Sequence, residues 1–117
     1  MKTTKELVSL LFDKFEGDEL FDKYFSLVDT DEEDLYFVFH SFSELFKDLL
    51  DEKVKKEKLF TRLCDFIDFT VSLENKEVDN VLKSEIFGVL NMEEKEKAIL
   101  KSYLSDKAFE MLNLMYD

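Results

Sequence analysis

Residues 31–74 read DEEDLYFVFHSFSELFKDLLDEKVKKEKLFTRLCDFIDFTVSLE, a run without glycine or proline. Apolar side chains recur in it every three or four residues, the spacing of one face of an α-helix. One helix over the whole run would be about 65 Å long at 1.5 Å per residue. A compact chain of this size has a radius of gyration of only about 13 Å. The helix must therefore break, and we expect the break in residues 51–58, where lysines replace apolar side chains.

The composition extends the helical prediction to the whole chain. The 117 residues include no proline and two glycines, whereas sheet proteins need turn residues every 8–12 positions or so. Hydrophobic residues make up 45%, enough for one core, so disorder is not expected. We predict an all-α single domain over residues 1–117, a compact bundle of six or seven short antiparallel helices. ARM- or HEAT-like helix pairs are the weaker alternative, because no internal repeat has a fixed period.

Capping residues mark where the helices should begin. Capping-box spacing is present in Thr3 with Glu6, Thr30 with Glu33, and Asn91 with Glu94. Further starts are expected after Asp18, near residue 57, after Asn75 and after Ser105, and Gly17 should end the first helix. The second helix should run to about Asp29 and the third should open near residue 31. The helix over about 57–73 is apolar on most of its circumference, which predicts a central position.

The acids of residues 29–34 do not make a calcium loop. An EF-hand loop needs glycine at its sixth position and an acid at its twelfth, and counting from Asp29 these positions hold Asp34 and His40. We interpret the acids instead as the cap and first turn of a helix, where negative charge is favourable.

Other catalytic and metal sites lack essential parts. His40 is the one histidine and Cys64 the one cysteine, too few for a zinc site or for the paired Glu-x-x-His motifs of di-iron bundles. Cys64 lies beside the apolar arc of its helix, where thiols are usually inert. We therefore expect no enzyme and no cofactor. A hydrolase with a carboxylate-bound metal remains the least favoured alternative.

Charge and cysteine content restrict partners and compartment. The net charge of −12 repels nucleic acid and anionic membranes, so neither is expected as a partner. A single cysteine allows no internal disulfide, and the first 20 residues lack a signal-peptide core. We expect a cytoplasmic protein. Its acidity serves solubility, or it serves binding to a basic protein.

The third helix carries the candidate binding residues. Its apolar arc centres on Leu35, Phe42 and Phe46, while Phe37 points the other way at the azimuth of Glu44 and Asp48. A neighbouring helix could cover Phe37, or Phe37 could be an exposed anchor surrounded by acids. Under the second interpretation Phe37→Ser weakens binding and leaves melting unchanged. The predicted partner-binding face comprises Glu33, Asp34, Tyr36, Phe37, Glu44 and Asp48.

Several stretches resemble a known family of proteins. They are LYFVFHSFSELFKDLL (35–50), LFTRLCDFIDFTVS (59–72), KEVDNVLKSEIFGVL (76–90) and KSYLSDKAFEMLN (101–113). Together they resemble a family of small, acidic, all-helical bacterial proteins of uncharacterised function that look like immunity proteins of toxin systems. The resemblance implies a single helical domain with ARM-like packing of paired helices, and it implies no catalytic residues.

These observations favour a non-enzymatic protein-binding domain. Its most concrete form is an immunity-like protein that neutralises a basic toxin through the acidic, aromatic-containing face. The alternative is a helical adaptor or structural module that forms a homodimer through its exposed aromatics.

Overall fold

The computed structural model describes residues 4–51 and 56–116, and these residues contain helices and no strand. The helices are α1 (Thr4–Phe15), α2 (Glu19–Tyr24), α3 (Leu35–Leu50), α4 (Glu57–Ser72), α5 (Lys76–Val81), α6 (Glu94–Tyr103) and α7 (Asp106–Met115). After α5 the chain continues as a π-helical turn, η1 (Leu82–Ile86), and a 3₁₀ turn, η2 (Phe87–Val89). The predicted all-α class is confirmed.

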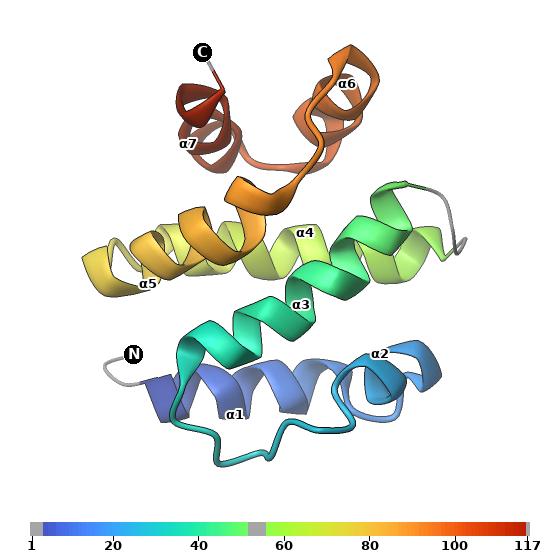
Figure 1. Ribbon diagram of the computed structural model, residues 1–117, viewed down its shortest axis with the longest axis vertical. Helices are drawn as coiled ribbons and strands as arrows, with labels where there is room; N and C mark the ends of the chain where they lie inside the picture. The colour runs from blue at the N-terminus through green and yellow to red at the C-terminus, as the bar shows by residue number, and fades with distance from the viewer. Residues whose placement is uncertain (1–3, 52–55, 117) are drawn as a thin grey trace.

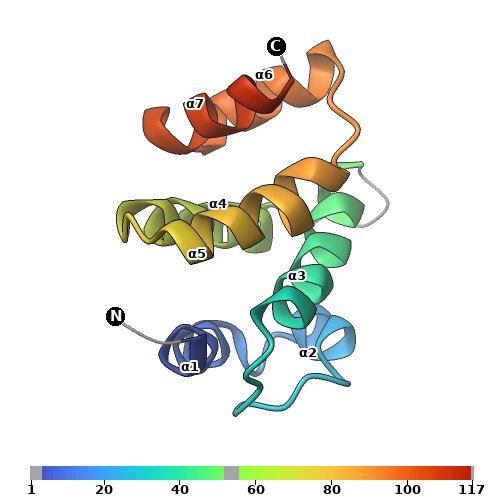
Figure 2. The same ribbon diagram turned by 60° about the vertical axis from the view of Figure 1, so that its left-hand side comes forward.

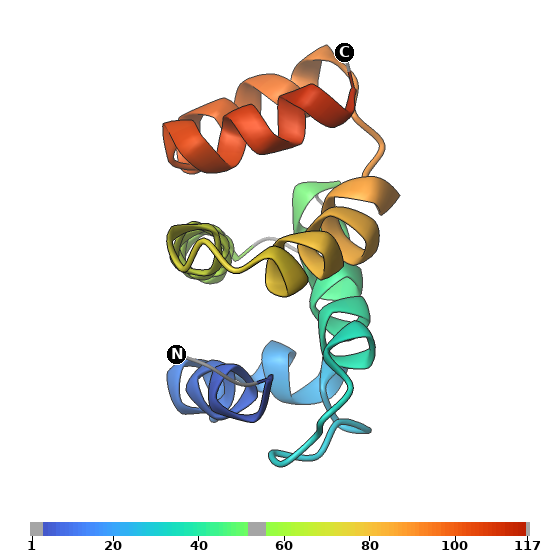
Figure 3. The ribbon, with the colours of Figure 1, turned by 90° about the vertical axis from the view of Figure 1, so that its left-hand side faces the viewer.

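The helices stack in three tiers (Figure 3). The first tier holds α1 and α2, the middle tier α4 and α5, and the last tier α6 and α7. Helix α3 runs diagonally from the first tier to the middle one, across the face of α4 (Figure 1). Figure 2 shows the same order from a view turned by 60°. The radius of gyration is 13.3 Å, as expected for one compact body.

The predicted break in the 31–74 run is confirmed, because α3 ends at Leu50 and α4 begins at Glu57. The central position of α4 is also confirmed, since it contacts α3, α5, α6 and α7. The buried side chains of α4 include Leu63, Phe66 and Ile67, each at most 2% exposed.

Three of the predicted helix starts are confirmed by their caps. The Asp18 carboxylate accepts hydrogen bonds from the backbone N–H groups of Leu20 and Phe21, both at 3.0 Å. Asn75 caps α5 in the same way, and the Ser105 hydroxyl accepts from the N–H of Ala108 at 3.2 Å. The predicted Thr3 cap lies outside the described residues. Gly17 follows the end of α1 with a φ of +92°, which confirms its role as a helix stop.

The boundary between the second and third helices differs from the prediction. Helix α2 ends at Tyr24 rather than near Asp29, and α3 begins at Leu35 rather than near residue 31. Asp34, not Thr30, is the N-cap, and its carboxylate accepts from the N–H of Tyr36 at 3.0 Å. The acids before it therefore precede the helix instead of forming its first turn. The reason is that Phe25 and Val28 reach the core from a turn, so the helix need not continue to bury them.

Two later boundaries also differ. Helix α6 is capped at Glu93, whose N–H donates to the Glu96 carboxylate at 3.2 Å, so the predicted pairing of Asn91 with Glu94 is wrong. The helix that begins after Asn75 stays α-helical only to Val81, although the apolar spacing predicts that it continues to Leu90. The apolar spacing also predicts inward positions for Ala98 and Met115, but both are exposed.

Phenylalanine rings form a continuous path through the three tiers. Phe21 stacks on Phe25 at 4.1 Å between centroids, and Phe15 stacks on Phe21 at 5.3 Å. The path continues from Phe15 to Phe66 of α4, then through Phe42, Phe46 and Phe60 to Tyr103 of α6, with centroid distances of 5.1–6.2 Å. Such contacts add about 0.5–1.5 kcal/mol each beyond the burial of area.

The turn after α5 depends on a glycine. A Cβ at Gly88 would lie 2.8 Å from the carbonyl oxygen of Lys83, in the π-helical turn. We expect Gly88→Ala to lower the free energy of unfolding by about 1–3 kcal/mol, because a backbone atom must move. Urea denaturation measures this.

Gly17→Asn is the matched control, since nothing lies within 4 Å of its Cβ position and asparagine tolerates positive φ. Gly17→Asn should lower the free energy of unfolding by less than Gly88→Ala does. Equal stability of Gly88→Ala and the wild type would contradict the proposed crowding.

Candidate binding site

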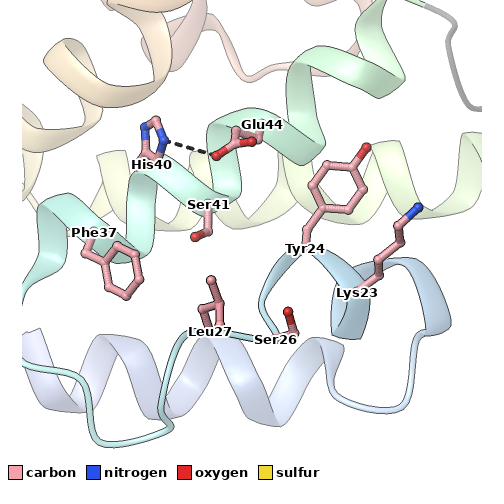
Figure 4. Close-up of a pocket in the computed structure, with 8 residues that line it drawn as sticks. All are labelled: Lys23, Tyr24, Ser26, Leu27, Phe37, His40, Ser41 and Glu44. Atoms are coloured by element: carbon pink, nitrogen blue, oxygen red, sulfur yellow. Dashed lines mark ion pairs between the residues drawn. The ribbon is translucent and has the colours of Figure 1, made fainter.

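A pocket of about 460 Å³ opens between the end of α2 and the outer side of α3 (Figure 4). We call it the α2–α3 pocket. Its lining residues come from two segments: Lys23, Tyr24, Ser26 and Leu27 from the end of α2 and the following turn, and Phe37, His40, Ser41 and Glu44 from α3.

Two large apolar side chains are exposed at this pocket. Leu27 is 84% exposed and Phe37 37% exposed. Figure 4 shows them on opposite sides of the opening, Leu27 from the turn and Phe37 from α3. Phe37 is thus not a core residue, although more than half of its surface is covered. Leu27 reaches this position because the chain leaves the helical conformation after Tyr24.

Ser41 forms the base of the pocket. It is 8% exposed, and Figure 4 shows its hydroxyl pointing toward Leu27 rather than into the core. Among residues 4–51 and 56–116, no side chain or carbonyl group lies at hydrogen-bonding distance and geometry from this hydroxyl. The hydroxyl oxygen is accessible to water from the pocket, since it is not one of the buried side-chain atoms without a hydrogen-bond partner.

Polar groups line the other end of the pocket. The Nε2 of His40 lies 3.0 Å from an Oε1 of Glu44, and both side chains are more than half exposed. The Tyr24 hydroxyl donates a hydrogen bond to the Asp48 carboxylate. This bond, together with partial burial, raises the pKa of Tyr24 to about 12. It also ties the end of α2 to α3.

The structure brings together part of the predicted binding face. Phe37 and Glu44 line the pocket. Asp48 accepts a hydrogen bond from Tyr24, which also lines the pocket. Tyr36 is 52% exposed on the adjacent side of α3. Asp34 is occupied as the N-cap, and Glu33 is exposed in the preceding loop. The six predicted residues are therefore divided between the pocket side of α3, its adjacent side and the loop before it.

Sequence reasoning missed most of the pocket. The predicted face did not include Lys23, Tyr24, Ser26, Leu27, His40 or Ser41. One signal was available, since Leu27 falls outside the apolar stripe formed by Phe21, Phe25 and Val28. A leucine outside the stripe indicates an exposed position, although not what lies opposite it.

The two sides of the pocket are joined by an acidic loop, residues 28–34. It carries Asp29, Asp31, Glu32, Glu33 and Asp34. The Glu32 carboxylate accepts from the N–H groups of Glu33 and Asp34, at 3.0 and 3.3 Å, so this acid shapes the loop. Asp29, Asp31 and Glu33 are exposed.

The predicted inertness of Cys64 agrees with its environment. The thiol is fully buried on α4, whereas His40 is exposed on the outer side of α3, so the two do not form a catalytic pair. Burial, with a smaller contribution from Asp68 and Asp65, raises the pKa of the Cys64 thiol. In the part of the chain that the structure describes, no group of three or more His, Cys, Asp or Glu side chains could hold a metal ion.

A second pocket of about 220 Å³ lies between α1 and α4 and has a different character. Arg62 covers the Phe15 ring, with its guanidinium carbon 4.8 Å from the ring centroid, and donates to the carbonyl of Lys14. The lining carries two cations, Lys14 and Arg62, and one acid, Asp65, and Arg62 is already engaged with α1.

Comparisons with known proteins give no assignment: no protein-family model, curated protein or solved structure matches the chain. The resemblance to immunity-type proteins therefore stays a prediction. None of the described helices is long and apolar enough to cross a membrane.

The Tyr24–Asp48 bond predicts a pH effect. The folded state raises the pKa of Tyr24 from its ordinary value near 10 to about 12, so the folded protein holds this proton more tightly than the unfolded chain. The Tyr24–Asp48 hydrogen bond therefore contributes to stability below pH 10, and this contribution is lost as the pH rises to about 12. We expect the difference in stability between wild type and Tyr24→Phe to shrink across this range, measured by denaturant titration.

Asp48→Asn provides the direct control. Titration of phenolate absorbance should show one tyrosine moving back toward a pKa near 10. An unchanged tyrosine titration would show that Asp48 does not hold the Tyr24 proton.

Burial of Cys64 predicts resistance to thiol reagents. Modification of the native protein by iodoacetamide should be at least tenfold slower than modification in denaturant, because the thiol is inaccessible and its pKa is raised. Mass spectrometry over time measures both rates, and similar rates would place Cys64 outside the core.

Proposed function

We propose that this protein is a non-enzymatic, cytoplasmic binding domain that holds a basic protein partner on the surface around the α2–α3 pocket. The observation that carries the proposal is the exposure of Leu27 and Phe37 on opposite sides of one pocket. Exposing large apolar side chains to water is unfavourable, and a concave site lined by them is a common place for ligands and partners.

Charge supports the choice of a basic partner. Glu44 lines the pocket, Asp48 lies one turn further along α3, and the acidic loop 28–34 joins the two segments of the lining, in a chain with a net charge of −12. Acidic surfaces of this kind speed association with basic partners and disfavour acidic ones. The most concrete form of the proposal is an immunity-like protein that occludes a basic toxin domain.

The homodimeric adaptor is supported less well. Two copies joined through this surface would bring their acids together, which opposes association. A second set of exposed apolar side chains, Val89 of η2 with Leu114 and Met115 of α7, does not line the pocket and would suit a different contact. Sedimentation would separate the two candidates, because a dimer predicts twice the monomer mass.

The proposal predicts capture of a basic protein that depends on Leu27. Affinity-tagged wild-type protein should retain it from an extract of the source cells, and Leu27→Ser should reduce the retained amount at least tenfold, as for a binding hot spot. Because Leu27 is 84% exposed, its substitution should change the free energy of unfolding by less than about 0.5 kcal/mol. Phe37→Ser should also weaken capture, with a stability cost of about 1 kcal/mol because most of its surface is covered.

Leu114→Ser is the matched control, since this leucine is 68% exposed on α7, in the tier opposite the pocket. It should leave capture unchanged. Higher salt should reduce capture by wild type, because exposed charges are screened. Equal capture by wild type and Leu27→Ser, or an acidic captured protein, would refute the proposal.

A further inference from the structure

We infer that the α2–α3 pocket binds an amphipathic basic helix of the partner, which places one large apolar side chain between Leu27 and Phe37 and a lysine or arginine beside Glu44 and Asp48. The inference rests on the proposed function and specifies which segment is recognised. Three features of the pocket support it: its shape along α3, the Ser41 hydroxyl, and the distribution of charge.

The first feature is the spacing of the residues on the outer side of α3. Phe37, Ser41, Glu44 and Asp48 follow one another at intervals of three or four residues, so they form a stripe along one side of the helix. The stripe is about 16 Å long at 1.5 Å per residue. A stripe of this form matches a second helix lying alongside, whose contacts repeat at the same intervals.

The second feature is the base of the pocket. Ser41 is 8% exposed, and its hydroxyl points into the pocket, where water can reach it. An aliphatic or aromatic side chain seated between Leu27 and Phe37 would lie near Ser41. A polar group of the inserted segment can then replace water as the hydrogen-bond partner of this hydroxyl.

The third feature is the change from apolar to acidic along the stripe. Phe37 lies at the apolar end, and Glu44 and Asp48 lie two to three turns further along α3. Within the described residues Glu44 is paired with the exposed His40, at 3.0 Å, and a surface pair of this kind is weak. A lysine or arginine of the partner can take the place of His40. The partner helix therefore carries its basic residue seven to eleven positions from its apolar anchor.

Lys23 lies at the same pocket and restricts the position of the partner's basic residue. It projects from the end of α2 on the side of Tyr24 (Figure 4), so it disfavours a cation next to α2. The favourable place for the cation is thus over α3, next to Glu44.

Selection from a phage-displayed library of random peptides about 16 residues long tests the inference. The full-length wild-type protein is the target, and Leu27→Ser protein removes peptides that bind elsewhere. We expect enriched peptides with one large apolar residue and a lysine or arginine seven to eleven positions away. Synthetic copies should bind wild type and Leu114→Ser equally and Leu27→Ser at least tenfold more weakly, measured by fluorescence anisotropy.

A separate variant tests the predicted position of the partner's basic residue beside Glu44. Glu44→Gln should weaken binding of the same peptides about three- to tenfold. A peptide with glutamate in place of its basic residue should bind wild type more weakly by the same factor. On Glu44→Gln this exchange in the peptide should change binding little. Absence of enriched peptides, enrichment without the basic residue, or equal binding to Leu27→Ser would each overturn the inference. If a cellular partner is still captured through Leu27 in that case, the proposed function stands and only the helical segment is wrong. If peptides are not enriched and no cellular partner is captured through Leu27, both the inference and the proposed function are wrong.

Discussion

The contact of phenylalanine rings across the three tiers is the interaction on which the rest of the structure depends. It begins at Phe25 and Phe21 of the first tier, crosses α4 and α3, and ends where Phe60 meets Tyr103 of α6. A domain of 117 residues has a high ratio of surface to volume, and 13 phenylalanines bury much area per residue. The rings thus join short helices that would be marginal alone.

The α2–α3 pocket is a consequence of this packing. Phe21 fixes α2 against the first tier, and Phe25 and Val28 reach the core from the turn that follows. A turn that buries residues 25 and 28 leaves Leu27 pointing to solvent. On α3 the core side is filled by Phe39, Phe42 and Phe46, so Phe37 can only lie on the outer side. Two apolar residues are therefore exposed together because their neighbours are buried.

The acidity of the chain has more than one role. Asp18 and Asp34 cap helices, and Glu32 accepts two backbone hydrogen bonds, so these carboxylates contribute to the fold. Asp48 holds the Tyr24 hydroxyl and connects α2 to α3. The exposed acids of the 28–34 loop and Glu44 are left for an interaction with a partner, and Asp48, which accepts one hydrogen bond from Tyr24, adds its charge near Glu44. Net charge alone does not separate these roles, whereas hydrogen-bond partners do.

The candidate site was predicted in part. Phe37 and Glu44 could be placed on one side of a helix, because helical periodicity relates residues within one element. Leu27, Tyr24 and Ser41 could not be placed with them, because their approach depends on how α2 packs on α3. The predicted start of α3 was wrong for a related reason. In a chain with 28 acids, capping-box spacing arises often, and tertiary packing selects which acid becomes the cap.

The sequence by itself determined the helical class, the break between α3 and α4, and the caps at Asp18, Asn75 and Ser105. These follow from local rules: few glycines, apolar period, and side chains that accept bonds from nearby backbone N–H groups. The tertiary structure alone decided where α2 stops, where the π-helical turn forms, and that Leu27 and Phe37 share one pocket. Those outcomes depend on contacts between residues distant in the chain, and the side chains that fill the core decide which neighbours remain outside.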